Sequence, residues 1–173
     1  MSKRALKEYL GELTKKQLQE QVLDLYNRFK PVKTYYNFVF NPKEEKLLED
    51  AKFKIAKEYF PVNTRKPKTR RSVAHKIIKH YLQLGVDAFV IAEVMAYNIE
   101  VSQEYTHKKM IKQDAFYIGM FKSFNELLDF IKSNGIENDF LPRCKNIVAV
   151  ADAQDWMNAI GFDDSLERFN EQH

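Results

Sequence analysis

The chain has 173 residues, of which 45% are hydrophobic and 30% charged, and its net charge is +4. This balance is typical of a globular protein and excludes a disordered chain, and the length suits one domain with a full hydrophobic core. The single cysteine, Cys144, excludes an intrachain disulfide and favours the cytoplasm. The sequence has neither a signal-peptide core nor an apolar run of about 18 residues, so we expect no membrane association.

Helical patterns dominate the first third of the chain. Residues 2–10 and 14–29 each carry an apolar stripe at helical spacing, and the second segment opens with a Thr-x-x-Gln capping box. The aromatic segment 32–40 fits a short helix or a strand, and its helical surroundings favour a helix. An Asn-Pro pair then begins a helix over residues 41–59.

The most unusual feature is the basic stretch, residues 59–86, which contains seven Lys or Arg and no acid. Outside it the net charge of the chain is −3. Two prolines place residues 60–69 in a loop, because proline interrupts a helix. An amphipathic helix follows, capped by Thr69 or Ser72 and ended by Gly85.

This loop and helix gather positive charge at one helix N-terminus. Arg and Lys side chains and the free N–H groups of a helix N-terminus are suited to binding phosphate. Arg70 and Arg71 oppose the helix dipole, which a bound anion or acids elsewhere in the fold would compensate. A solvated basic surface without a ligand is the alternative interpretation. The candidate anion-binding residues are Arg65, Lys66, Lys68, Arg70, Arg71, His75, Lys76 and Lys79.

The segment 88–110 has apolar residues on nearly every face of its first three turns, which predicts the most buried helix of the fold. A link of about three residues makes this helix antiparallel to the basic one. We expect its acidic stripe to neutralise Lys76 and Lys79 in part. A second interpretation is a pocket that perturbs the pKa of an acid among apolar neighbours. The candidate pocket residues are His80, Glu93, Tyr97 and Glu100.

The sequence contains no G-x-S-x-G, P-loop, G-x-G-x-x-G or H-E-x-x-H motif. Glu104 and His107 form one Glu-x-x-His pair, whereas a helical di-iron site needs two such pairs and further glutamates. We therefore assign no catalytic residue, no metal site and no cofactor. An enzyme is the least favoured of the function classes considered.

The sequence pattern also predicts helices in the remaining chain, residues 114–173. Residues 114–134 and 137–151 carry apolar stripes, and the acidic segment 152–173 includes a terminal helix. We predict an all-α protein of seven to nine helices, either a bundle or a short stack of αα-hairpins. Residues 1–151 would form the helical domain, with the acidic segment packed on it.

Four short motifs carry a resemblance to a known family: FNP at 40–42, EYFP at 58–61, RKPKTRRS at 65–72 and LGVD at 84–87. Together they resemble a family of small bacterial all-helical proteins catalogued as a domain of unknown function. The resemblance extends to about Phe124 and weakens after it. It implies a bacterial cytoplasmic protein and singles out the basic loop, but it implies no activity.

Two kinds of binding function follow from these features. In the first, the basic stretch binds nucleic acid, through its backbone phosphates, or a phosphorylated ligand. In the second, the chain is a protein-interaction scaffold without a nucleic-acid role. Its aromatic N-terminal helices would then receive a partner, and the basic stretch would bind an acidic protein or the chain's own acidic segment.

Overall fold

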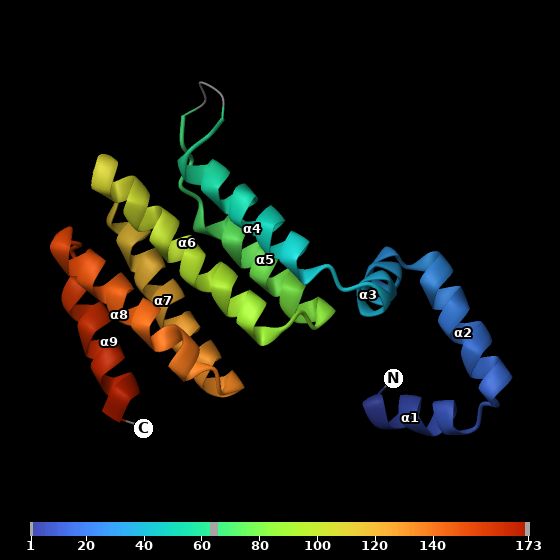
Figure 1. Ribbon diagram of the computed structural model, residues 1–173. Coiled ribbons are helices and arrows are strands. Elements are labelled where there is room, and N and C mark those ends of the chain that lie inside the picture. The colour runs from blue at the N-terminus through green and yellow to red at the C-terminus, as the bar shows by residue number, and fades with distance from the viewer. Residues whose placement is uncertain (1, 63–65, 172–173) are drawn as a thin grey trace. The chain divides into compact units, whose positions relative to one another are not determined.

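The computed structural model describes residues 2–62 and 66–171, and these parts of the chain form nine α-helices and no strand (Figure 1). The predicted all-α class is thereby confirmed. The chain divides into an N-terminal unit, Met1–Lys43, and a C-terminal unit, Glu44–His173, whereas the sequence analysis divided it after residue 151. The helices are α1 (Lys3–Gly11), α2 (Lys15–Arg28), α3 (Lys30–Phe40), α4 (Glu44–Tyr59), α5 (Arg71–Leu84), α6 (Ala88–Lys108), α7 (Asp114–Asn134), α8 (Glu137–Ala153) and α9 (Ala159–Glu171).

The N-terminal unit consists of α1, α2 and α3. The capping box at the start of α2 is present, with Thr14 Oγ1 accepting from the Gln17 amide at 3.3 Å and the Gln17 side chain accepting from the Thr14 amide at 2.9 Å. Tyr26 on α2 contacts α3 through a 3.2 Å hydrogen bond to Asn37. None of the side chains of these three helices is buried. The described part of this unit therefore has no core of its own.

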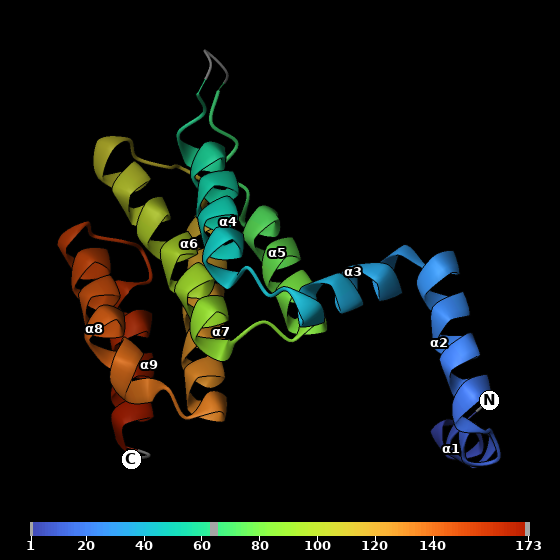
Figure 2. The same cartoon turned by 45° about the vertical axis from the view of Figure 1, so that its right-hand side comes forward.

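Helix α6 is the centre of the C-terminal unit. It packs against α4, α5, α7 and α8, and more of its residues are buried than in any other helix of the described chain (Figures 1 and 2). This burial agrees with the apolar character expected from its sequence. Because α6 is enclosed by its neighbours, its charged side chains must find partners on those neighbours.

The acidic C-terminal segment is part of the same core. Helix α9 packs against α7 and α8 and buries Phe162, Leu166 and Phe169. Trp156, in the link before α9, is 4% exposed. Among the described residues, no ion pair joins α9 to the basic stretch. The apolar face of the segment thus holds it in place.

The start of α5 differs from the sequence prediction. Its N-cap is Arg70, which makes no side-chain capping hydrogen bond, so neither Thr69 nor Ser72 caps the helix. Thr69 instead has φ of +47°, in the left-handed region that β-branched residues seldom adopt. Gly85 ends the helix in a left-handed conformation, as predicted. The backbone before α5 therefore makes a sharp turn.

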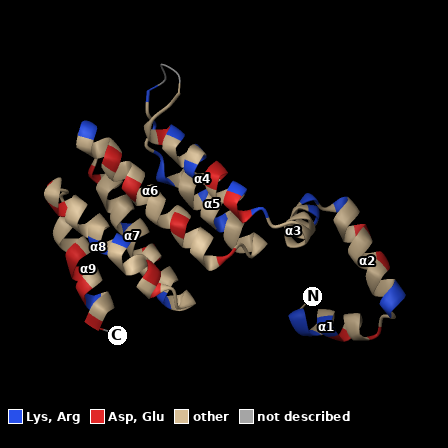
Figure 3. Cartoon of the chain, viewed as in Figure 1, with Lys and Arg blue, Asp and Glu red and all other residues tan. Residues whose placement is uncertain are grey.

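The link between α4 and α5 and the link between α6 and α7 lie at the same end of the C-terminal unit (Figures 1 and 2). Figure 3 shows Lys and Arg along the described part of the first link and at the end of α6. The fold thus brings together two basic segments that are about 40 residues apart in sequence.

Candidate functional site

Glu58, near the end of α4, holds the return of the basic loop. Its main-chain carbonyl accepts hydrogen bonds from the amides of Lys68 and Thr69, at 2.9 and 3.0 Å. Its carboxylate accepts two from Arg70, from Nε at 2.7 Å and from Nη2 at 2.9 Å. These hydrogen bonds from Arg70 hold the pKa of Glu58 below its usual value of 4.5. Arg70 is therefore engaged in fixing the loop.

Arg71, the first residue of α5, is engaged with α7. Its Nη2 donates to both carboxylate oxygens of Glu126 at 2.8 Å, and its Nε donates to Ser123 at 2.7 Å. Gly119 allows this contact, because a Cβ there would lie 3.3 Å from Arg71 Cδ. Burial, and then the charge of Arg71, lower the pKa of His75 against the opposing effect of Glu126. His75 Nε2 lies 3.4 Å from Glu126 Oε2, so this side chain borders the same contact.

The lysines of the basic stretch remain without such partners. Lys66, Lys68, Lys76 and Lys79 form no ion pair with any residue in 2–62 or 66–171. Arg65 lies outside the described residues. Apart from Arg65, the candidate anion-binding set thus separates into four exposed lysines and three residues that contact carboxylates, namely Arg70, Arg71 and His75. Of these, Lys68 and Arg71 line the cleft described next, whereas Lys76 and Lys79 lie further along α5.

A cleft of about 730 Å³ lies between the basic loop and the α6–α7 link. We call it the cationic cleft, because four of its lining residues are basic and none of those in the described chain is acidic: Lys68, Arg71, Lys109 and Lys112. Lys109 and Lys112 also form no ion pair with described residues. Its apolar lining comes from Tyr105, Met110, Ile111, Ala115, Phe116 and Met120. A solvent-accessible site with unpaired cations and an apolar wall is suited to an anionic ligand.

The two lysines of the α6–α7 link, Lys109 and Lys112, were not among the anion-binding residues predicted from the sequence. The sequence KKMIKQ at 108–113 is basic, but Lys and Arg are common elsewhere in the chain. Only the packing of α6 against both α5 and α7 places these lysines opposite Lys68. A cluster of charges is visible in a sequence when its residues are neighbours along the chain. The lysines of this cleft come from two separate segments, so the sequence alone does not show them as one cluster.

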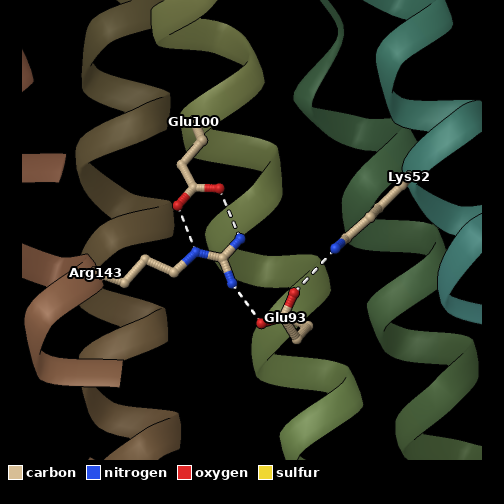
Figure 4. A network of polar contacts seen from close by, with 4 residues as sticks. All are labelled: Lys52, Glu93, Glu100 and Arg143. Carbon is tan, nitrogen blue, oxygen red and sulfur yellow. Dashed lines mark hydrogen bonds and ion pairs between the residues drawn. The ribbon is translucent and has the colours of Figure 1, made fainter. Parts of the chain in front are cut away.

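The acidic stripe of α6 is paired with other helices. Figure 4 shows Arg143 of α8 between Glu93 and Glu100, and Lys52 of α4 beside Glu93. Arg143 Nη1 lies 2.6 Å from Glu93 Oε1, Nη2 lies 2.6 Å from Glu100 Oε2, and Nε binds Glu100 Oε1. Lys52 Nζ lies 3.0 Å from Glu93 Oε2. This network, with all four side chains part-buried, connects α4, α6 and α8.

The network accounts for three of the four candidate pocket residues. Burial raises the pKa of Glu93, but hydrogen bonds from Lys52 and Arg143 outweigh burial and lower it overall. Tyr97 lies next to the same group, with Lys52 Nζ 5.5 Å from its ring centroid. His80 is exposed on α5, where its ring contacts Tyr81.

The acidic stripe was expected to neutralise Lys76 and Lys79 in part, but in the described chain its acids form no ion pair with either lysine. The stripe acids bind Lys52, Arg143 and Lys108 instead. The reason is that Glu93 and Glu100 face α4 and α8, so the nearest cations come from those helices.

Cys144 is fully buried in α8, and burial raises the pKa of its thiol to about 12. A thiol with this pKa remains protonated at neutral pH and is a poor nucleophile.

The described helices include none that is both long and apolar enough to cross a membrane.

Fold and cleft together define a small all-helical protein with an accessible cationic site. The chain belongs to a family of unknown function, DUF6155, whose model matches residues 1–170. The match extends well beyond Phe124 and includes the C-terminal helices. No curated protein matches the chain, and no solved structure matches it.

The network around Arg143 leads to a prediction for stability. Arg143→Met removes the shared partner of Glu93 and Glu100 and leaves two part-buried carboxylates with one lysine. We expect a loss of about 2 kcal/mol in the free energy of unfolding, measured with urea. Lys108→Met, which removes an exposed pair with Glu104 on α6, is the matched control and should cost a few tenths of a kcal/mol, roughly. Equal losses in the two variants would contradict a structural role for the network.

The Glu58–Arg70 pair leads to a prediction for pH dependence. Because the folded chain lowers the pKa of Glu58, the ionised carboxylate stabilises the fold above its usual pKa of 4.5. This contribution disappears as the pH falls through the lowered pKa. Glu58→Gln should therefore be less stable than the wild type at pH 7, and the difference should shrink below pH 4.5. Urea unfolding at pH 7 and pH 3 measures it, with Glu104→Gln as the exposed-pair control. A difference that is constant with pH would contradict the assignment.

Proposed function

We propose that this protein is a helical binding module whose cationic cleft binds a phosphate-bearing ligand. The observation that supports it is the set of three lysines around the cleft, Lys68, Lys109 and Lys112, which lack ion pairs with described residues. The arginines beside them are each bound to a carboxylate. Positive charge that the fold itself leaves unpaired is available to a ligand.

The cleft concentrates this charge for an anion. Like charges that line one cleft create a positive potential, because the low-dielectric protein around them focuses the field. A phosphate group bound between the lysines would neutralise them and accept hydrogen bonds from their ammonium groups. The loop that carries Lys68 is held by Glu58, so this lysine is positioned before the ligand arrives.

We predict that removing lysines from the cleft weakens phosphate binding more than removing the same number of lysines elsewhere. Titration calorimetry with pyrophosphate at low salt should show binding to the wild type. The double variant Lys109→Gln/Lys112→Gln should bind about tenfold or more weakly, since each charge-assisted hydrogen bond contributes roughly 1.5–3 kcal/mol. The matched control is Lys76→Gln/Lys79→Gln, which removes two lysines of α5 that do not line the cleft.

The control variant should keep the affinity of the wild type within about twofold. Equal weakening in both variants would show a general effect of net charge and would contradict a site in the cleft. The absence of pyrophosphate binding to the wild type would overturn the proposed function. We also propose a cytoplasmic location for the protein, because a single free cysteine is typical of a reducing compartment.

A second candidate function is protein interaction through the N-terminal unit. Its three helices bury no side chain and expose large apolar residues, among them Leu23 at 60% and Phe40 at 81%. Exposed apolar surface of this kind is characteristic of an interaction site. We infer that this unit presents its apolar side chains to another polypeptide.

Substitution of these apolar residues separates an interaction surface from a structural core. Leu23→Ser and Phe40→Ser in the full-length chain should change the free energy of unfolding by no more than about 0.5 kcal/mol, because exposed side chains contribute little. They should also reduce the binding of an apolar dye. Leu82→Ser, at an exposed leucine of α5, is the control and should leave dye binding less affected. A loss of several kcal/mol in stability would show that the two side chains belong to a core.

A further inference from the structure

The cationic cleft has two chemically different linings. Its lysines come from the basic loop and the α6–α7 link, and its apolar side chains include Tyr105, Phe116 and Met120. A bare inorganic anion would contact the lysines and leave the apolar lining in water. A ligand that combines a phosphate group with an apolar body would use both linings.

Two aromatic rings of the cleft are held by other rings. The ring of Tyr105 lies 5.9 Å from that of Tyr59 and 5.8 Å from that of Phe60. The ring of Phe116 lies 5.2 Å from that of Tyr117 and 6.1 Å from that of Trp156. Such clusters restrict ring motion. A planar ligand ring could therefore pack on Phe116, the less buried of the two, at a small cost in conformational entropy.

The cleft also contains uncharged polar groups. Gln113, the N-cap of α7, makes no side-chain capping hydrogen bond, and its exposed amide lines the cleft. A carboxamide offers two donors and an acceptor, which is the set of groups that pairs with the polar edge of a nucleobase. Thr69 adds a hydroxyl on the opposite side, in the left-handed turn that follows Lys68.

We propose that the ligand of the cationic cleft is a mononucleotide, with its phosphate on Lys68, Lys109 and Lys112 and its base against Phe116. This inference rests on the proposed phosphate site. The cleft volume of about 730 Å³ lies within the range of small-molecule sites, about 300–1,000 Å³, and suits one nucleotide. The part-buried ring of Phe116 lines the same cleft as the lysines, so a phosphate joined to a planar base would contact both.

The test compares two ligands with the same phosphate and sugar. AMP and ribose 5-phosphate differ in the base alone, so calorimetry on the full-length protein isolates the contribution of the base. AMP should bind about tenfold or more tightly than ribose 5-phosphate, the typical effect of one stacked base. Trp156 is the single tryptophan of the chain and contacts Phe116, so AMP should also change its fluorescence.

Variants locate the base within the cleft. Phe116→Ala should remove most of the preference for AMP over ribose 5-phosphate. Phe116→Leu, which keeps the side chain apolar and bulky, should retain the fold and lose part of the preference. Phe53→Ala, at a phenylalanine of α4 that is 56% exposed and outside the cleft, is the matched control.

The outcomes distinguish this inference from the proposed function. Equal affinities for AMP and ribose 5-phosphate, with pyrophosphate still bound, would overturn the mononucleotide and keep the phosphate site. The absence of binding by all three would overturn both. A single-stranded oligonucleotide that binds far more tightly than AMP, with a steep salt dependence, would overturn the mononucleotide in favour of a nucleic-acid strand.

Discussion

The cationic cleft depends on the contact between Glu58 and the returning basic loop. One residue accepts four hydrogen bonds there, two on its carbonyl from consecutive amides and two on its carboxylate from Arg70. The paired amides explain how Thr69 is held at φ of +47°, a conformation that is unfavourable for a β-branched residue. This contact fixes the backbone at Lys68 opposite the α6–α7 link, while the contact of Arg71 with Ser123 and Glu126 holds the first turn of α5.

Arginine and lysine have different roles in this region. Arg70 forms a forked pair of hydrogen bonds with Glu58, for which the planar guanidinium is suited, whereas Arg71 divides its donors between Glu126 and Ser123. The lysines carry a compact charge on a flexible chain and are left free around the cleft. The seven cations of the basic stretch are thus not one site. Arg70 and Arg71 hold the loop and the start of α5, whereas Lys68 lines the cleft together with Lys109 and Lys112 of the α6–α7 link.

The sequence predicts the helices well because their signals are local. The capping box of Thr14 and the left-handed Gly85 each act within a few residues. The candidate site depends on partners distant in sequence, such as Glu126 for Arg71 and Lys109 opposite Lys68. Periodicity showed that α6 is buried, but it could not show which neighbours its acids face. That information resides in the packing of α4 and α8 against α6.

The core network and the cleft are mechanically connected through α4 and α6. Lys52 and Glu93 join the middle of α4 to the first third of α6, and Glu58 and Tyr105 lie on the same helices closer to the cleft. Tyr59 and Tyr105 continue the contact, with their rings 5.9 Å apart. The ion pair of Lys52 with Glu93 and the ring contact of Tyr59 with Tyr105 thus join α4 to α6 at two levels, and the second of these levels borders the cleft.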